Sequence, residues 1–364
     1  MDRVPASEPP QSSESLRKPI GYLTPADLST GGDLKSDPED FVVEEIPAYL
    51  PSGSGEHLFL WIEKRDLSAD VMLDRLARGL GMSRNDIGSA GIKDRRAVTR
   101  QWLSVPSRCE PALAGLEIEG FRILDRAQHG NKLRTGHLKG NRFEIRLRDV
   151  AESAAGAADR IADLLRQSGV PNLYGDQRFG IDNQTLELGL ALLRGEKPVR
   201  SIPFARRKFL LRLALSSVQS ALFNDLLAAR LADGTLNRVQ PGDVLQVVAS
   251  GGCFVAEDTA VEQARCESGE TVITGPMFGP RMKAPTGEAA ALEARSLEEW
   301  RLKPEMFERF PDLTSGTRRP LRVFSGNLEA RNAAGALELR FDLPSGAYAT
   351  SVTREFQKLA EKQG

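Results

Sequence analysis

The sequence has few cysteines and no long apolar run, and each shortage excludes a class of protein. Three of the 364 residues are cysteines, Cys109, Cys253 and Cys266, and they lie far apart. Because an odd and scattered set does not form a disulfide framework, we expect free thiols in a reducing cytoplasm. The longest apolar run, residues 58–62, is far shorter than the roughly 18 residues of a membrane-spanning helix. The first residues also lack the apolar segment of a secretory signal, so we expect a soluble cytoplasmic protein.

Net charge is also nearly absent, since 49 Lys and Arg face 50 Asp and Glu. A protein that coats nucleic acid without selectivity is usually basic overall, so a nucleic-acid site in this chain must be a local patch. Residues 121–148 contain eight Lys or Arg and two acids, and residues 197–212 contain six and no acid. Residues 257–299 offset them with nine acids against four bases. Charge alone leaves open whether the basic stretches bind nucleic acid or are ordinary solvated faces.

The motifs of several enzyme classes are missing as well. Residues 52–57 are rich in glycine but lack the Lys-Ser/Thr of a P-loop, and no G-x-G-x-x-G lies between a predicted strand and helix. The histidines do not form H-E-x-x-H, no cysteines form C-x-x-C, and no G-x-S-x-G elbow is present. We therefore expect no metal site, no small-molecule cofactor and no serine-hydrolase chemistry.

What the sequence does contain is typical of a globular chain. It is 40% apolar and 27% charged, and at ~100–200 residues per domain its length predicts two or three folding units. Residues 1–18 are rich in Ser, Pro and Glu, which predicts a disordered tail. A strand-rich first part, a helical middle and a strand-rich end indicate that one domain is inserted into another.

Apolar periodicity predicts the individual strands and helices. Alternation of apolar and charged residues is clearest at 143–148 and 337–343, which predicts strands with one apolar face. Further strands are predicted at 41–46, 58–62, 97–105, 243–248, 271–274 and 321–328, the last in a hairpin with 337–343. Helices are predicted from Ser68 to Gly81, around 161–169 and 186–195, and over 209–232 and 288–302.

Two segments are candidates for chemistry. Asp94 follows a flexible glycine, and its neighbours Lys93, Arg95 and Arg96 would keep it ionised and could hold phosphate oxygens. From spacing alone, an ordinary salt-bridged turn is the favoured interpretation of this segment. Residues 172–180 mix aromatic, amide and Arg side chains between glycines, which suits base stacking and base-edge hydrogen bonds. A tightly packed turn between domains would have the same composition.

Six motifs in order along the chain change this balance in favour of a functional Asp94. They are KSDPEDFVVEE at 35–45, GIKDRRAVTRQ at 91–101, KGNRF at 139–143, NLYGDQRFG at 172–180, SALFN at 220–224 and GAYATSVTRE at 346–355. By these motifs the sequence resembles the TruD family of tRNA pseudouridine synthases, from about Gly21 to the C-terminus.

The resemblance implies roles for particular residues. Asp94 corresponds to the catalytic aspartate, Asn141 to its hydrogen-bonding neighbour, and Phe143 to the aromatic residue that stacks on the target uracil. Lys35 corresponds to a basic residue near the catalytic group. The other expected substrate contacts are Arg95, Arg96, Gln177, Arg178 and Phe179. Because Phe143 points to the same face of its predicted strand as Ile145 and Leu147, the residues themselves leave open a plain core role.

The resemblance also implies an α+β fold with two domains in a V-shaped molecule. A pseudouridine-synthase catalytic domain, residues 19–168 and 319–364, would contain a mixed, mainly antiparallel sheet with flanking helices. An inserted α+β TRUD domain, residues 169–318, would interrupt it.

The implied reaction is the isomerisation of a uridine, in this family usually position 13 of a tRNA. The C1′–N1 bond breaks and the uracil is rejoined through C5, without net redox change or hydrolysis. Asp94 as a nucleophile at the sugar and Asp94 as a base that removes the 2′ hydrogen both remain open. We expect a monomer that binds structured tRNA and no membrane. Two alternatives stay open: a synthase acting on another RNA, and a non-catalytic RNA-binding or RNA-folding protein.

Overall fold

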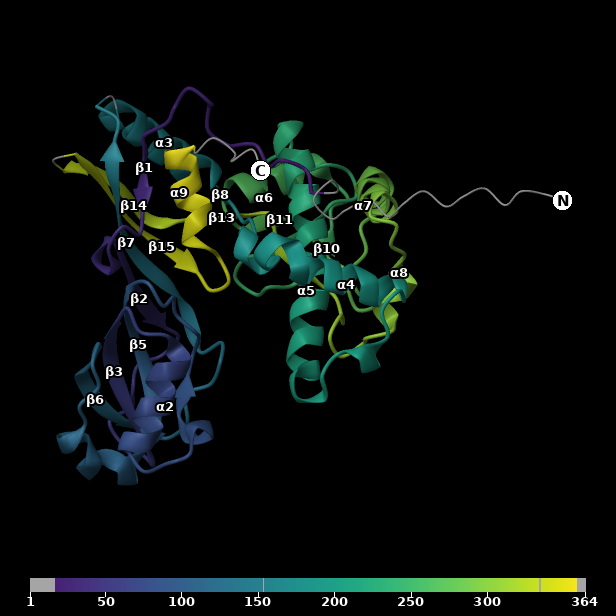
Figure 1. Cartoon of the computed structure of the whole chain (residues 1–364). Helices are drawn as coiled ribbons and strands as arrows, with labels where there is room; N and C mark the ends of the chain where they lie inside the picture. The colour runs from purple at the N-terminus through teal and green to yellow at the C-terminus, as the bar shows by residue number, and fades with distance from the viewer. Residues whose placement is uncertain (1–16, 153, 334, 359–364) are drawn as a thin grey trace. The chain divides into compact units, whose positions relative to one another are not determined.

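The computed structural model describes residues 17–152, 154–333 and 335–358, which divide into two compact units (Figure 1). Residues 24–170 and 323–358 form the first, which we call the sheet unit, and residues 17–23 and 171–322 form the second, the helical unit. The tail expected at residues 1–18 lies outside the described residues up to position 16. Arg17 and Lys18 each form an ion pair of 2.6 Å, with Asp176 and Glu299.

Nine strands form one sheet within the described part of the sheet unit. Seven follow the order β14-β15-β7-β2-β5-β3-β6, with β1 beside β7 and β4 beside β5. Because β2 and β5 are parallel and the other pairs antiparallel, the predicted mixed, mainly antiparallel α+β architecture is confirmed. The strands are β1 (Gly31–Leu34), β2 (Phe41–Pro47), β3 (His57–Arg65), β4 (Gly88–Ser89), β5 (Val98–Pro106), β6 (Phe121–His129), β7 (Leu138–Val150), β14 (Gly326–Ala333) and β15 (Ala336–Pro344).

The alternation predicted for β7 and β15 gives this sheet one apolar face. Phe143 lies opposite Phe341 and Ile145 opposite Leu339 in the β7–β15 register, and all four are buried. Glu144 and its neighbours of the same parity lie on the other, more exposed face. Helices α3 (Ala154–Ser168) and α9 (Ala349–Gln357) cover the apolar face, packing on β14 and β1 respectively.

Helix α2 (Ala69–Gly79) covers the other half of the sheet. Its Met72 and Leu76 pack with Leu60 of β3 and Leu103 of β5 in one buried cluster. The Ser68 side chain accepts a hydrogen bond from the Val71 amide, as expected for an N-cap. The predicted helix from Ser68 to Gly81 is therefore confirmed.

Helices α4 (Gln184–Arg194) and α5 (Phe204–Ala232) build the core of the helical unit. A Cβ on Gly189 of α4 would lie 2.2 Å from the Ala214 carbonyl oxygen, so glycine permits this close approach of the two helices. Helix α5 begins at Phe204, five residues before the predicted start at 209. The prediction followed the buried residues, whereas the first turns of α5 are largely exposed.

Smaller elements complete the helical unit. A four-stranded sheet has the order β10-β9-β11-β12, and helices α6, α7 and α8 connect or flank its strands. Their bounds are β9 (Val244–Val247), β10 (Cys253–Val255), α6 (Thr259–Glu267), β11 (Thr271–Met277), α7 (Gly287–Glu299), α8 (Pro304–Glu308) and β12 (Thr317–Pro320). Helix α7 ends three residues before the predicted 302, because Arg301 has a left-handed φ of 50°.

The strand predicted at 321–328 is wrong in its first half. The hairpin strand β14 begins at Gly326, while β13 covers only Arg322–Val323. Leu321 belongs to the core of the helical unit, and Leu328 is buried in the sheet unit. One apolar stretch thus serves two cores, which its composition alone does not reveal.

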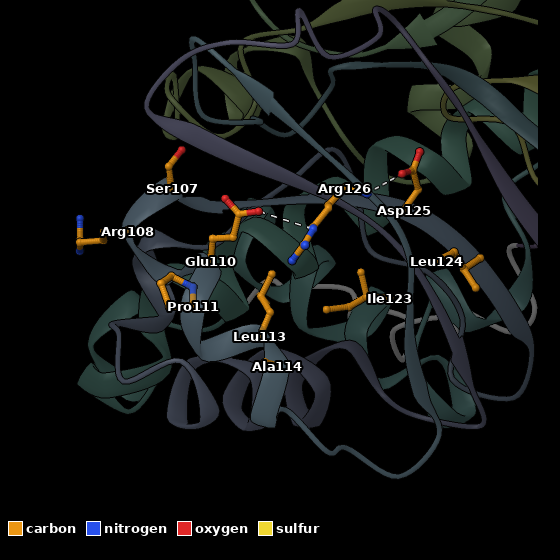
Figure 2. A pocket seen from close by; sticks show the side chains of 10 residues that line it. All are labelled: Ser107, Arg108, Glu110, Pro111, Leu113, Ala114, Ile123, Leu124, Asp125 and Arg126. Carbon is orange, nitrogen blue, oxygen red and sulfur yellow. Dashed lines mark hydrogen bonds and ion pairs between the residues drawn. The ribbon is translucent and has the colours of Figure 1, made fainter.

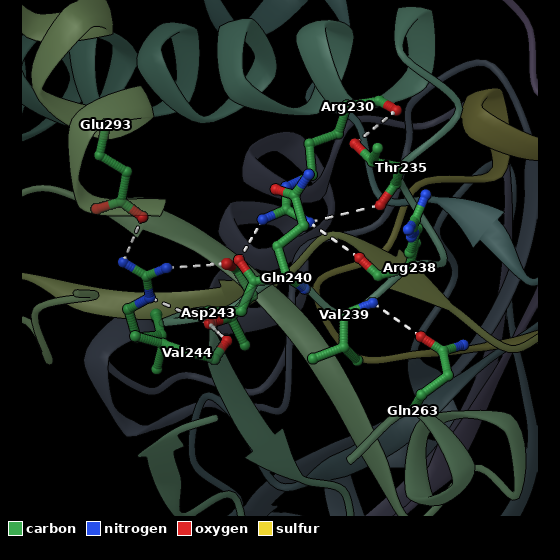
Figure 3. Close-up of polar contacts among 11 residues, drawn as sticks. Arg230, Thr235, Arg238, Val239, Gln240, Asp243, Val244, Gln263 and Glu293 are labelled. Atoms are coloured by element: carbon green, nitrogen blue, oxygen red, sulfur yellow. Dashed lines mark hydrogen bonds and ion pairs between the residues drawn. The ribbon is translucent and has the colours of Figure 1, made fainter. Parts of the chain in front are cut away.

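A buried ion pair lies in the interior of the helical unit. The Arg230 guanidinium donates hydrogen bonds to Asp243 and to the carbonyl oxygens of Thr235 and Arg238 (Figure 3). Both charged side chains of the Arg230–Asp243 pair are 3% exposed. Removing one partner of such a pair leaves an uncompensated buried charge, which usually costs more stability than the pair contributes.

We predict that Asp243→Asn destabilises the protein by about 3–5 kcal/mol, because Arg230 would keep its charge without a counter-ion. Urea unfolding followed by circular dichroism measures the loss. Glu270→Gln is the control, since Glu270 pairs with Arg265 at the surface and its removal is expected to leave the urea midpoint nearly unchanged. Equal midpoints for the two variants would contradict the prediction.

Candidate active site

Asp94 lies in the loop between β4 and β5, where the structure brings it close to Lys35. The Lys35 Nζ is 3.7 Å from Asp94 Oδ2, and the aspartate side chain is 45% exposed. Lys35 has a φ of 60°, a left-handed conformation that is uncommon for a residue other than glycine. Its ammonium also lies 3.9 Å from the centre of the Phe41 ring, a cation–π contact. Such strain tends to persist where the surrounding structure enforces it, often at functional sites.

Three polar side chains from three strands fasten this loop to the sheet. Lys64 of β3 donates to the Asp94 carbonyl oxygen, and Gln101 of β5 donates to the Gly91 carbonyl oxygen at 3.3 Å. Lys93 within the loop donates to Glu45 of β2 at 3.1 Å. The backbone that carries Asp94 is therefore bound at three points.

Lys64 is a functional candidate that the sequence reasoning missed. Its side chain is completely buried, and it forms no ion pair with any residue that the structure describes. Burial lowers the pKa of Lys64 to about 8, although attraction to Asp94 opposes the shift. A signal was available, because Lys64 continues the buried period-2 series Leu58, Leu60 and Ile62 on β3.

Glu45 and Lys93 form a buried pair beside the loop. The second carboxylate oxygen of Glu45 accepts a hydrogen bond from the Trp102 amide at 3.4 Å. Burial raises the pKa of Glu45, and Lys93 opposes that rise. The β2–β7 register places Glu45 directly opposite Asn141.

Asn141 has unused hydrogen-bonding capacity. Its side-chain oxygen is buried and has no hydrogen-bond partner among the described residues. The hydrogen bond expected between Asn141 and Asp94 is not formed there either, so this role stays a prediction. A buried amide oxygen without a partner usually bonds to water or a ligand.

Phe143 packs in the core of the sheet unit, 6% exposed. Its ring stacks on Phe341 with centroids 5.3 Å apart and meets Phe41 edge-on at 6.1 Å. It shares the buried face with Ile145 and Leu147, as its position on the predicted strand implied. Stacking on a uracil stays a prediction for this ring.

The loop cations Arg95 and Arg96 are exposed. Arg96 donates to the Ser36 carbonyl oxygen at 2.9 Å, so it joins the loop of Asp94 to the segment of Lys35. Neither arginine forms an ion pair within the described residues, which leaves both charges available for phosphate.

Gln177, Arg178 and Phe179 belong to the helical unit. Gln177 is exposed, and Arg178 Nε donates to Ser220 Oγ at 3.2 Å. Phe179 is completely buried in a core cluster, with the Arg17 guanidinium 4.2 Å from the centre of its ring. In this conformation Phe179 contributes packing and offers no surface to a base.

Two motifs of the helical unit hold each other in place. Asn224 on α5 accepts a hydrogen bond from the Tyr174 amide at 3.0 Å and donates one to the Tyr174 carbonyl oxygen at 2.8 Å. The Asn224 side chain thereby satisfies both backbone polar groups of Tyr174, as a neighbouring strand would do. This pairing gives Asn224 a structural role in the second motif, because both hydrogen bonds are to the backbone of Tyr174.

The two basic stretches differ in how many of their cations form ion pairs. Five of the eight cations at 121–148 pair with acids, whereas none of the six at 197–212 does so with a described residue. The five pairs are Arg122–Glu63, Arg126–Glu110, Arg142–Asp342, Arg146–Glu338 and Arg148–Asp40. A count of charges along the sequence therefore overstated the free charge of the first stretch.

One surface pocket of the sheet unit contains none of the predicted site residues. It lies between the 3-10 turn Ser107–Gly115 and β6, where Leu113 and Ile123 line it and Arg126 approaches Glu110 to 3.5 Å (Figure 2). We therefore place the candidate site at Asp94 and not in this pocket.

Two further properties concern only the described residues. No helix among them is both long and apolar enough to cross a membrane. They also contain no group of three or more His, Cys, Asp or Glu placed to share a metal ion.

Known proteins resemble this chain over most of its length. The family model described as tRNA pseudouridine synthase D (TruD) matches residues 20–199 and 205–356. A relative from Anaeromyxobacter sp. (strain Fw109-5), named tRNA pseudouridine synthase D, is 43% identical, and the match covers 92% of this chain and 95% of the relative. A relative of the same name from a strain of Thermus thermophilus is also 43% identical, and that match covers 93% of this chain and 92% of the relative.

A solved TruD structure from Methanosarcina mazei has a TM-score of 0.76 at 24% identity and covers 95% of this chain and 97% of its own. That likeness extends the match from sequence to fold. The chain belongs to the TruD family of tRNA pseudouridine synthases.

Proposed function

We propose that this protein isomerises a uridine of tRNA, at position 13, to pseudouridine, with Asp94 as the catalytic carboxylate. The observation that carries the proposal is the placement of Asp94, half-exposed on a loop that buried side chains hold and 3.7 Å from the Lys35 ammonium. Its relatives of 43% identity are named for the same activity on tRNA.

The residues around Asp94 suit this chemistry. Both routes for breaking the C1′–N1 bond need an ionised carboxylate at the ribose, as nucleophile or as base. Lys35 offsets the negative charge of Asp94 and can donate to the RNA. Arg95 and Arg96 can hold phosphates, and Asn141 supplies an unused amide oxygen.

The target base must leave its stack before it can react, at a cost of a few kcal/mol. We propose that Phe143, which is 6% exposed, contacts the displaced uracil. Phe41 and Phe341 hold the orientation of the Phe143 ring by packing against it.

We further propose that the sheet unit is the catalytic domain and that residues 171–322 form the inserted TRUD domain. The grouping of Lys35, Asp94, Asn141 and Phe143 in the sheet unit supports this assignment. Since the reaction has no net redox change, we propose that it needs neither metal nor cofactor. A cytoplasmic monomer acting on tRNA is the simplest form of the enzyme.

We predict that Asp94→Asn abolishes pseudouridine formation and leaves tRNA affinity within about twofold, because the amide preserves shape but is neither a nucleophile nor a base. Carbodiimide-blocked primer extension on tRNA detects the product, and fluorescence anisotropy gives the affinity. Full activity of the variant would overturn the role of Asp94.

Mapping of pseudouridine in total RNA, with and without the gene, distinguishes the substrates. Loss at position 13 of tRNA is expected. Loss only in another RNA would favour the alternative synthase, and no loss anywhere would favour a non-catalytic RNA-binding protein.

Lys64 is proposed as a positioning residue, because it bonds to the backbone of Asp94. We predict that Lys64→Met lowers kcat by about 10- to 100-fold at pH 7 with little change in KM, as expected for loss of a charged hydrogen bond. The folded-state pKa of about 8 means that Lys64 loses its charge as the pH rises through 8. The kcat of the unmodified enzyme should fall in that range.

The pH dependence of kcat distinguishes a positioning role of Lys64 from a role in folding alone. Lys64→Met has no charge to lose, so its residual kcat should lack the step near pH 8, while a step from uracil ionisation would remain in both proteins. Single-turnover rates from pH 6.5 to 9.5 measure this difference. The same step in both profiles would rule out Lys64 as its origin.

A further inference from the structure

The six cations of residues 197–212 form an unusual surface in the helical unit. They are Lys197, Arg200, Arg206, Arg207, Lys208 and Arg212, and all except the half-buried Arg207 are exposed. No acid occurs in this stretch, and no ion pair joins any of the six to another described residue. Their charges are uncompensated, unlike those of the paired arginines at 121–148.

Two aromatic side chains are exposed among these cations. Phe204 is 86% exposed and Phe209 is 61% exposed, although large apolar side chains are normally buried. At 3.6 residues per turn, Phe204, Lys208, Arg212 and Phe209 occupy about 140° of the surface of α5. We call the surface formed by these four residues the α5 patch, and the other four cations adjoin it in the sequence.

The α5 patch is an ordered surface. The Arg207 guanidinium donates two hydrogen bonds, of 3.2 and 3.0 Å, to the Ile202 carbonyl oxygen, and lies 5.5 Å from the centre of the Phe204 ring. Ile202 is itself 3% exposed in the core that contains Leu211 and Leu215. The core thus anchors the segment while the phenylalanine rings stay in solvent.

We propose that the α5 patch binds RNA, its cations contacting phosphates and Phe204 and Phe209 stacking on unpaired bases. Uncompensated Lys and Arg beside exposed aromatic rings are the combination that single-stranded nucleic acid requires, because bases stack on the rings while cations follow the backbone. Where the RNA is the tRNA substrate, the inference rests on the proposed function. The binding itself can be measured without catalysis.

An anionic membrane surface is the main competitor for such a patch. RNA is favoured because Lys208 and Arg212, at about 40° and 80° around the helix from Phe204, lie between the two rings and do not occupy a separate polar face. A membrane-surface helix needs a continuous apolar face to enter the lipid. Two rings about 140° apart do not make one.

Two double variants of the full-length protein test the α5 patch. Phe204→Ser with Phe209→Ser removes the stacking surface, and Lys208→Gln with Arg212→Gln removes two charges. Ile181→Ser with Val261→Ser is the control for the first, since these side chains are 80% and 54% exposed. Arg166→Gln with Arg331→Gln is the control for the second, because both arginines pair with exposed acids.

Binding of an unmodified, labelled tRNA transcript is measured by anisotropy over a salt series. We expect the aromatic variant to weaken binding about tenfold or more. The charge variant should bind more weakly. The slope of log K against log salt should also become shallower by about 1.5 to 2, because with two fewer phosphate contacts the binding releases fewer counter-ions. Both controls should bind as the parent protein does.

Three results would overturn the proposal. They are unchanged affinity and salt slope in both patch variants, equal losses of affinity in the controls, and an effect of the variants only on flotation with phosphatidylserine vesicles.

Circular dichroism checks that the variants fold. Steady-state assays should show a raised KM with unchanged kcat in both patch variants. Inactive Asp94→Asn with normal binding by the patch variants would reject the patch alone, whereas active Asp94→Asn with weakened patch variants would reject the catalytic assignment alone.

Discussion

The burial of Lys64 under the loop of Asp94 is the constraint on which the candidate site depends. A buried ammonium needs acceptors, and the Asp94 carbonyl oxygen is one of them, so moving the loop away from the sheet would cost free energy by leaving Lys64 without this hydrogen bond. Gln101 and the Glu45–Lys93 pair add two more attachments from neighbouring strands. The Asp94 side chain, although on a loop, thereby acquires the positional precision of a sheet, which its proposed catalytic role requires.

Several features of this site were accessible from the sequence for simple physical reasons. The period-2 pattern of residues 143–148 and 337–343 predicted both strands and the shared face of Phe143, because a sheet with one solvated side imposes that pattern. The catalytic role proposed for Asp94 came from the motifs, not from its charge environment. Lys64 was missed because a lysine in a strand is assumed to face water, although its parity placed it among Leu58, Leu60 and Ile62.

Other features depend on contacts between distant residues and could not be predicted. The partners of Arg122, Arg142 and Arg146 come from other strands, so a local charge count could not show that these arginines are neutralised. Phe179 looked like a base-stacking platform within its glycine-bounded loop, yet the structure buries it. Its neighbour Tyr174 is held by Asn224, about fifty residues away. In this chain, residues of the segment 172–180 thus serve packing and the shape of the loop.

The order of the strands has a consequence for how the protein is made. Strand β7, inside the sheet between β2 and β15, pairs with β15, which is synthesised only after the whole of residues 171–322. At ordinary rates of translation this delay is on the order of ten seconds. Until Phe341 emerges, Phe143 lacks the ring on which it stacks. A ribosome-bound fragment therefore lacks β15, a strand that pairs with β7, and tRNA meets a finished sheet unit only when translation is complete.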